Sequence, residues 1–197
     1  MADGDRWSGG RPASLAPFLS HLRRHGVRVS LTGGHALDLL YGIRRSHKDV
    51  DLLLPIEDLP ALVESLPGRR YLGPSPTRTG GMVVTDLGYT DLLTGIKGPD
   101  GLWRPSWRPN GVPWPAGHPF DHWLCVGGYT LPVLSAPDML LRVLADFGVG
   151  SPRHRTEGAL LERLLTPGER SWLDAHLAEH GLTDTHAPLD PFRHRPG

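Results

Sequence analysis

The strongest constraint on the fold comes from residues 49–54, where two aspartates precede a run of three leucines. Asp49 and Asp51 stand two apart, and the leucines continue until a proline ends the run. An apolar run of this length is typical of a buried strand, and a strand places residues two apart on one face. Two surface charges on an edge strand are the alternative, but Asp is poorly suited to a strand. The pattern therefore predicts paired carboxylates on a strand.

A glycine pair precedes these aspartates, between a predicted strand over residues 27–31 and a predicted helix over residues 35–41. Because Gly33 and Gly34 lack Cβ atoms, their backbone can approach phosphate oxygens closely. The free N–H groups and the positive end of the following helix would form an anion site. A basic run then follows and offers phosphate contacts, with a solvated surface patch as the alternative. Its members are Arg44, Arg45 and His47.

The order strand, Gly-Gly, helix, basic run and paired aspartates resembles the signature of the polymerase-β nucleotidyltransferases. It is most similar to the small antibiotic nucleotidyltransferases that modify aminoglycosides and lincosamides. The matching residues are Gly33-Gly34, His35 in place of the usual aromatic residue, Ala36-Leu37-Asp38, Gly42, Arg44 or Arg45, His47 and Asp49-Val50-Asp51. The resemblance covers about residues 27–165 and is strongest in the first third of that range. Asp38 could equally hydrogen-bond within the protein or contact a ligand.

The resemblance implies an α+β fold, a polymerase-β-like nucleotidyltransferase core in which helices flank a mixed sheet. We expect this core over residues 14–134 and a C-terminal helical region with its tail over residues 135–197. Residues 1–13 show no periodicity and are expected to be disordered. Helices are expected over residues 14–26, 35–41, 60–66, 135–146, 156–165 and 167–180, and strands over 27–31, 49–54, 82–85, 90–93, 123–126 and 129–133, with a short one near Tyr71.

The resemblance also implies the chemistry of the site. Asp49 and Asp51 are expected to bind magnesium, two Mg²⁺ ions in all, together with the substrate phosphates. The family's third carboxylate follows a hairpin glycine, which assigns it to Asp91 as a metal ligand or general base. Asp86 is the rival for this role. The residues expected to bind the nucleotide are Gly33, Gly34, Arg44, Arg45 and His47.

The expected reaction transfers a nucleoside monophosphate from a nucleoside triphosphate to a hydroxyl of a small molecule, an antibiotic, and releases pyrophosphate. ATP is expected rather than GTP, although the residues alone do not distinguish them. One alternative is a nucleotidyltransferase acting on a protein or RNA end, of the toxin–antitoxin type. Another is a non-catalytic nucleotide-binding module, which the three carboxylates disfavour. Lys+Arg and Asp+Glu number 21 each, so no bulk positive field favours a nucleic acid polymer.

The cellular setting follows from the single cysteine and the absence of long apolar stretches. Cys125 alone can form neither an internal disulfide nor a cysteine zinc cluster, which fits a reducing compartment. No stretch approaches 18 apolar residues, and the first ten residues contain no apolar signal region. We therefore expect a cytoplasmic protein without a membrane partner. Its oligomeric state is not indicated.

Three further features have two interpretations each. Residues 98–120 are rich in Pro and Trp without periodicity, which predicts a long surface loop whose Trp103, Trp107 and Trp114 could line the acceptor pocket. The run His176-Leu177-Ala178-Glu179-His180 matches an inverted zinc-protease pattern. Little chain follows it to supply a third ligand, so surface histidines are the favoured interpretation. The group His118, Asp121 and His122 could also bind a metal, but surface histidines are again the favoured interpretation.

Overall fold

The computed structural model describes residues 12–43, 45–66, 70–71, 81–85, 87–115, 119–147 and 151–182, and the statements below concern these ranges. The disorder expected over residues 1–13 falls outside them, except for residues 12 and 13, which belong to the first helix. The described residues form two compact units, one from residues up to 109 and 113–134, the other from 110–112 and residues after 134. Within the described ranges no helix is long and apolar enough to cross a bilayer.

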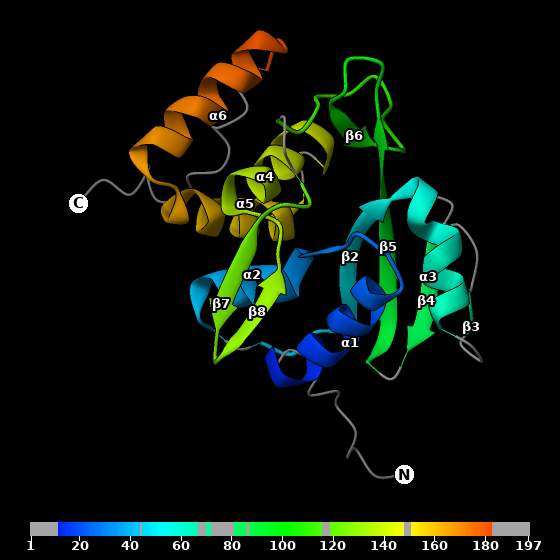
Figure 1. The fold of residues 1–197 in the computed structure, drawn as a ribbon. Helices are drawn as coiled ribbons and strands as arrows, with labels where there is room; N and C mark the ends of the chain where they lie inside the picture. The colour runs from blue at the N-terminus through cyan, green and yellow to red at the C-terminus, as the bar shows by residue number, and fades with distance from the viewer. Residues whose placement is uncertain are drawn as a thin grey trace. The chain divides into compact units, whose positions relative to one another are not determined.

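A mixed six-stranded sheet forms the centre of the first unit (Figure 1). Its strands run in the order β1-β2-β5-β4-β3, and β6 pairs with β5 outside this path. The two central strands β2 and β5 are parallel, whereas every other pair in this sheet is antiparallel. The bounds are β1 Ser30–Thr32, β2 Asp49–Pro55, β3 Arg70–Tyr71, β4 Gly81–Thr85, β5 Gly88–Lys97 and β6 Trp103–Pro105.

Helices α1, α2 and α3 and the hairpin of β7 and β8 complete the first unit. Helix α1 buries Leu15, Leu19 and Leu22, which recur at helical spacing on one face. Helix α2 packs on β1 and β2, and α1 contacts both β8 and α3. The bounds are α1 Pro12–Arg24, α2 Gly33–Tyr41, a 3₁₀ turn η1 Ile56–Asp58, α3 Leu59–Ser65, β7 Trp123–Val126 and β8 Tyr129–Pro132.

The second unit is helical, and its central helix α4 contacts α5 and α6. Side-chain caps begin each helix: Ser135 caps α4, Ser151 caps α5, and Thr166 forms a capping box with Glu169 at α6. A proline follows each cap within the first turn, where its missing N–H costs no helical bond. The bounds are α4 Ala136–Arg142, a π-helical turn η2 Val143–Phe147, α5 Pro152–Leu164 and α6 Pro167–Glu179.

The α+β fold class, a mixed sheet flanked by helices with a helical C-terminal region, is confirmed. One element prediction is wrong, because residues 98–120 are not simply a surface loop. Trp103 begins strand β6, and the buried Trp114 donates its backbone N–H to the carbonyl oxygen of Trp103 at 2.7 Å. The segment shows no periodicity because prolines interrupt it, yet burying a large indole stabilises it against the sheet.

Several predicted boundaries also differ from the structure. Strand β5 is ten residues long, whereas only residues 90–93 were expected, because its apolar alternation is interrupted by Thr94 and Gly95. Strand β1 begins at Ser30 rather than residue 27, and the expected helix 135–146 divides into α4 and the π-helical η2. Helix α5 begins four residues before the expected 156, at the proline that follows its cap.

Candidate active site

The three predicted carboxylates lie on one face of the two central strands. Asp51 on β2 is the register partner of Asp91 on the parallel strand β5, and Asp49 stands two residues before Asp51. Partners in register, and residues two apart on a strand, share one face of a sheet. Asp91 is buried, 8% exposed, whereas Asp49 and Asp51 are partly exposed. Asp86, the rival of Asp91, lies outside the described residues.

The glycine pair forms the first turn of α2 directly after β1, and the Asp51 carboxylate lies against it. Gly33 has a φ of 63°, which side-chain-bearing residues rarely adopt. A Cβ atom at Gly33 would overlap the Asp51 carboxylate, with Asp51 Cγ only 2.6 Å away. Since the first N–H groups of a helix lack helical partners and carry the positive end of its dipole, this turn can bind an anion.

Gly33→Ala tests this close approach. The added methyl group would displace the Asp51 carboxylate, and misplacing a reacting group by about 1 Å can lower a rate by up to about 100-fold. Gly101→Ala is the matched control, because Gly101 has a φ of 79° but only Lys97 Cε within 4.0 Å of the added atom. We expect both variants to lose stability, while only Gly33→Ala loses most of the nucleotidyl transfer that the resemblance implies, measured as pyrophosphate release. Equal activity in the two variants would contradict the placement.

Asp38 on α2 anchors the residues of the basic run. Its carboxylate is 4% exposed and accepts hydrogen bonds from Arg45 N at 2.7 Å and Arg45 Nε at 2.6 Å. His47 Nε2 lies 2.8 Å from Asp38 Oδ2, so this nitrogen donates. Burial alone would raise the pKa of Asp38, but the hydrogen bonds from His47 and Arg45 together lower that pKa below its usual value. Of the two roles left open for Asp38, the structure shows internal hydrogen bonding.

This anchoring brings the basic residues to the glycine pair. Arg45 Nη2 donates to the Gly34 carbonyl oxygen at 3.4 Å. A Cβ atom at Gly34 would lie 2.5 Å from His47 Nδ1, so the imidazole packs directly over this glycine. The predicted Arg44 lies outside the described residues. The sequence allowed internal hydrogen bonding for Asp38 but did not identify Arg45 and His47 as its partners.

His35, which stands where the family has an aromatic residue, is a buried member of this cluster. Its ring is 2% exposed and lies 4.2 Å from the His47 ring, centroid to centroid. Burial, together with the charge of the neighbouring His47, lowers the pKa of His35 from 6.5 to about 4. The imidazole is therefore neutral near pH 7, and it packs against His47 while it also hydrogen-bonds the Asp49 backbone.

His35→Phe is expected to make the protein more resistant to acid. As the pH falls from 6.5 towards 4, the unfolded chain protonates His35 and the folded protein does not, so the free energy of unfolding falls by up to about 3 kcal/mol. Above pH 6.5 this loss is absent. Phe retains the ring without the titration, so the variant should lose less stability between pH 7.5 and 5 in urea unfolding. His25→Phe, at an exposed position, should behave as the parent does; an identical loss in all three proteins would contradict the assignment.

The structure agrees only in part with the expectations for the tryptophans of residues 98–120 and for the group His118, Asp121 and His122. Trp114 is 1% exposed, so it belongs to the core of its unit rather than to a ligand surface. Trp103 is partly exposed, packs edge-on against Phe120 and lies under the Arg28 guanidinium. His122 Nδ1 lies 2.7 Å from the Val133 carbonyl oxygen, whereas His118 lies outside the described residues. A role for Trp103 and Trp107 in an acceptor pocket stays a prediction.

Solved structures of antibiotic-modifying enzymes share this fold. The crystal structure of ANT(2'')-Ia in complex with adenylyl-2''-tobramycin has a TM-score of 0.59 and 15% identity, over 86% of this chain and 98% of that one. The solution structure of the antibiotic-resistance factor ANT(2'')-Ia has a TM-score of 0.57 and 17% identity, over 90% and 98%. Lincomycin-bound LnuA, a lincosamide antibiotic adenylyltransferase, has a TM-score of 0.56 and 19% identity, over 77% and 96%.

Comparison of the sequence with family models identifies the family of this chain. No curated protein matches the chain significantly. The family model of the aminoglycoside-2''-adenylyltransferases matches residues 14–154, which include the glycine pair, the basic run and all three aspartates. This match covers well over half of the chain and agrees with the resemblance of residues 31–54 to antibiotic nucleotidyltransferases. The chain belongs to the aminoglycoside-2''-adenylyltransferase family of nucleotidyltransferases.

Proposed function

We propose that this protein transfers the adenylyl group of ATP to a hydroxyl of an antibiotic and releases pyrophosphate. The observation that carries this proposal is the pairing of Asp51 with Asp91 on neighbouring parallel strands, with Asp49 on the same face. The Asp51 carboxylate also lies against the first turn of α2, so the carboxylates and an anion-binding turn are adjacent. This is the arrangement that binding a metal-chelated triphosphate requires.

The donor set fits magnesium. Asp49, Asp51 and Asp91 offer only hard carboxylate oxygens, which Mg²⁺ prefers, and we assign them two Mg²⁺ ions. When bound, Mg²⁺ would neutralise charge on the phosphates and polarise the α-phosphate. The N–H groups of the first turn of α2 at Gly33 and Gly34 would bind phosphate oxygens, assisted by Arg45, His47 and Arg44 of the basic run.

The reaction follows as an in-line displacement. The acceptor hydroxyl oxygen attacks the α-phosphorus of ATP, the new P–O bond forms, and the bond to the β-phosphate bridging oxygen breaks. Pyrophosphate leaves with that oxygen. We assign Asp91, the most buried of the three carboxylates, to accept the hydroxyl proton as general base. Asp38 acts through Arg45 and His47, which it holds in place, and is a positioning residue.

The acceptor class is proposed from the family and the shared fold. The names of the similar structures refer to tobramycin and lincomycin, an aminoglycoside and a lincosamide. We propose an aminoglycoside as the first acceptor to test, with residues 14–134 as the nucleotidyltransferase core and residues 135–197 as the C-terminal region. Consumption of ATP fits a cytoplasmic enzyme, and a net charge of zero gives no reason to expect a nucleic acid polymer.

The decisive experiment incubates the protein with α-labelled ATP or GTP, Mg²⁺ and a panel of aminoglycosides, lincosamides and nucleoside antibiotics. Parallel reactions contain RNA or a protein extract in place of the antibiotic. Label transfer to one small molecule, with equimolar pyrophosphate and a mass gain of one adenylyl group (AMP less one water), is the expected result. Transfer to RNA or protein alone would favour the toxin–antitoxin type of acceptor. No transfer and no pyrophosphate under any condition would contradict the proposal and favour a binding module.

A further inference from the structure

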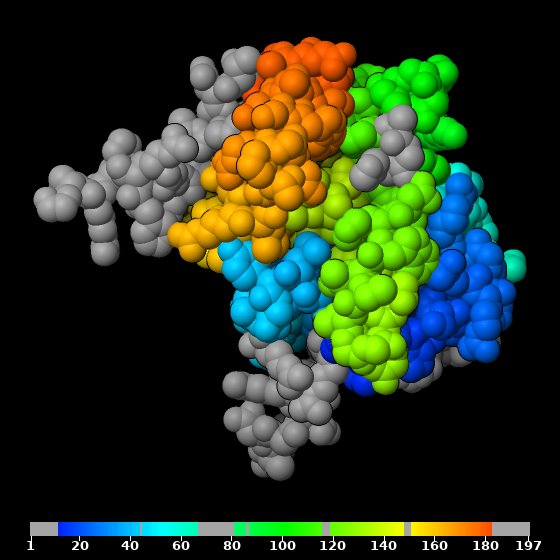
Figure 2. Space-filling view, turned by 60° about the vertical axis from the view of Figure 1, so that its left-hand side comes forward, coloured from blue at the N-terminus to red at the C-terminus, as the bar shows by residue number. Residues whose placement is uncertain are grey.

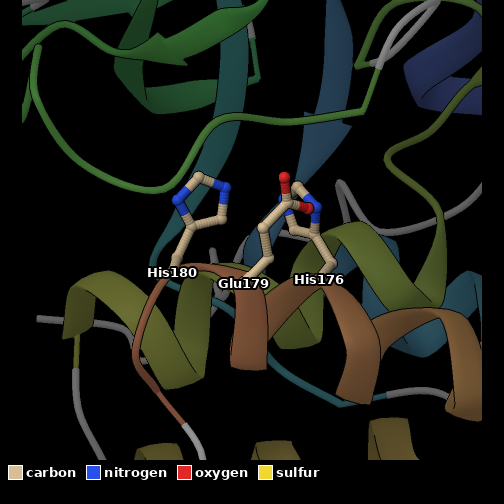
Figure 3. Close-up of side chains that lie close together, drawn as sticks. All are labelled: His176, Glu179 and His180. Atoms are coloured by element: carbon tan, nitrogen blue, oxygen red, sulfur yellow. The ribbon is translucent and has the colours of Figure 1, made fainter.

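Three metal-binding side chains gather at the last turn of α6, outside the candidate active site. His176, Glu179 and His180 each offer one ligand atom, and these three atoms all lie within 4.8 Å of one another. Spacings of three and four residues place side chains on one face of a helix. Figure 3 shows the two imidazoles and the carboxylate pointing to the same side of the helix. Two imidazoles and a carboxylate on one turn are a potential chelating group.

The cluster is accessible and partly held in place. Glu179 and His180 are exposed and His176 is partly exposed. Figure 2 shows α6, in orange, at the surface. The His176 ring stacks on Trp172 with a centroid distance of 5.4 Å and an interplanar angle of 18°, and it meets the His180 ring edge-on at 5.0 Å. Stacking restricts the His176 ring, so less conformational freedom is lost when an ion binds it.

We propose that His176, Glu179 and His180 bind one Zn²⁺ ion. Imidazole nitrogens suit zinc and its neighbours among the transition metals, whereas Mg²⁺ prefers an all-oxygen octahedron. Zinc bonds of about 2.0–2.2 Å place tetrahedral ligand atoms about 3.4 Å apart, a distance that rotation of the two exposed side chains can reach. His180 is also the C-cap of α6, where the negative end of the helix dipole favours a cation.

The ion would join the last helical turn to its C-cap and so stabilise the end of α6. Three protein ligands leave a fourth tetrahedral position for water. The site belongs to the helical second unit, whereas the three aspartates belong to the first. The two imidazoles favour a transition metal, whereas the three aspartates favour Mg²⁺. The inference is therefore independent of the proposed nucleotidyl transfer.

The test titrates Zn²⁺ into the full chain without an affinity tag, after removal of metals with a chelator and in excess Mg²⁺. Calorimetry should show one bound equivalent, and Co²⁺ substituted for Zn²⁺ should give a visible d–d absorption band. Since loss of a group that merely orients a ligand weakens metal binding by about 10- to 100-fold, His176→Gln and His180→Gln should each weaken it by at least about tenfold. Glu179→Gln should weaken it to a smaller extent.

The His21 and His25 pair on α1 supplies a matched control. These rings also stand four residues apart, with centroids 4.4 Å from each other. However, no third His, Cys, Asp or Glu among the described residues completes a metal-binding group with this pair. His25→Gln should therefore bind Zn²⁺ as the parent does. Absence of zinc binding by the parent, or an affinity unchanged by both His176→Gln and His180→Gln, would overturn the proposal.

Discussion

Asp49→Asn is expected to abolish nucleotidyl transfer while the fold stays intact. The amide has the shape of the carboxylate but no charge, so it binds a hard cation weakly. Metal ions contribute several kcal/mol to stabilising the charge of such a transition state, and kcat should fall by about 10³-fold or more. Asp49 is partly exposed at the first residue of β2, so the exchange leaves the core unchanged. Pyrophosphate release measures the loss, and circular dichroism checks the fold.

Asp100→Asn is the matched control for this loss. Asp100 lies in the turn between β5 and β6, where its carboxylate is ion-paired with Arg104 at 2.6 Å in a solvent-exposed position. Asp100 belongs to neither the three candidate carboxylates nor the glycine turn, so the variant should keep the parent's activity even where loss of the bidentate pair with Arg104 lowers stability. Substantial transfer by Asp49→Asn, at a level near that of Asp100→Asn, would refute the assignment of the metal site.

Arg142→Met is expected to destabilise the protein by about 3–5 kcal/mol, because removing one partner leaves a buried charge without its counter-ion. Arg142 is 4% exposed on α4, and its Nη1 donates to Asp146 Oδ2 at 2.7 Å. Its Nη2 donates to the Val112 carbonyl oxygen at 2.9 Å. Met has a similar length but replaces neither interaction. Urea unfolding, followed by far-ultraviolet circular dichroism, measures the change in the free energy of unfolding.

Two companion variants make this prediction specific to the buried pair. Arg142→Met combined with Asp146→Leu removes both charges and should regain much of the lost stability. Arg153→Met removes the surface pair with Glu157 on α5, in which the arginine side chain is 66% exposed, and should change stability by less than about 0.5 kcal/mol. An Arg142→Met variant as stable as Arg153→Met would show that the buried pair does not hold this unit together.

Local patterns predicted most elements of the fold. The strand, glycine pair, helix and acidic strand of residues 31–54 follow one another in the structure as expected, because each has its own periodicity or breaker. The β7–β8 hairpin over Gly127 and Gly128 is also confirmed. Residues 98–120 were misinterpreted, since the pairing of β6 with β5 depends on partners that local periodicity does not report.

The candidate site required information that no local pattern contains. That Asp49 and Asp51 share a face follows from their spacing, but the position of Asp91 depends on β5 pairing with β2 in parallel. Sequence reasoning placed Asp91 through family resemblance alone. The anchoring of Arg45 and His47 by Asp38 likewise depends on how the basic run folds back over α2. The catalytic and nucleotide-binding roles of these residues stay predictions.

The parallel register of β2 and β5 bears on how the enzyme can diversify. The spacing of Asp51 and Asp91 is set by the ladder between two central strands, not by the chain that links them. That connection is not a simple loop, because it contains α3, β3 and β4, and β4 pairs with β5 on the side away from β2. A slip of β5 by a single position would turn Asp91 to the opposite face. Changes aimed at other acceptors are therefore best placed outside β2, β5, β4 and β3, where they leave the register of Asp51 and Asp91 intact.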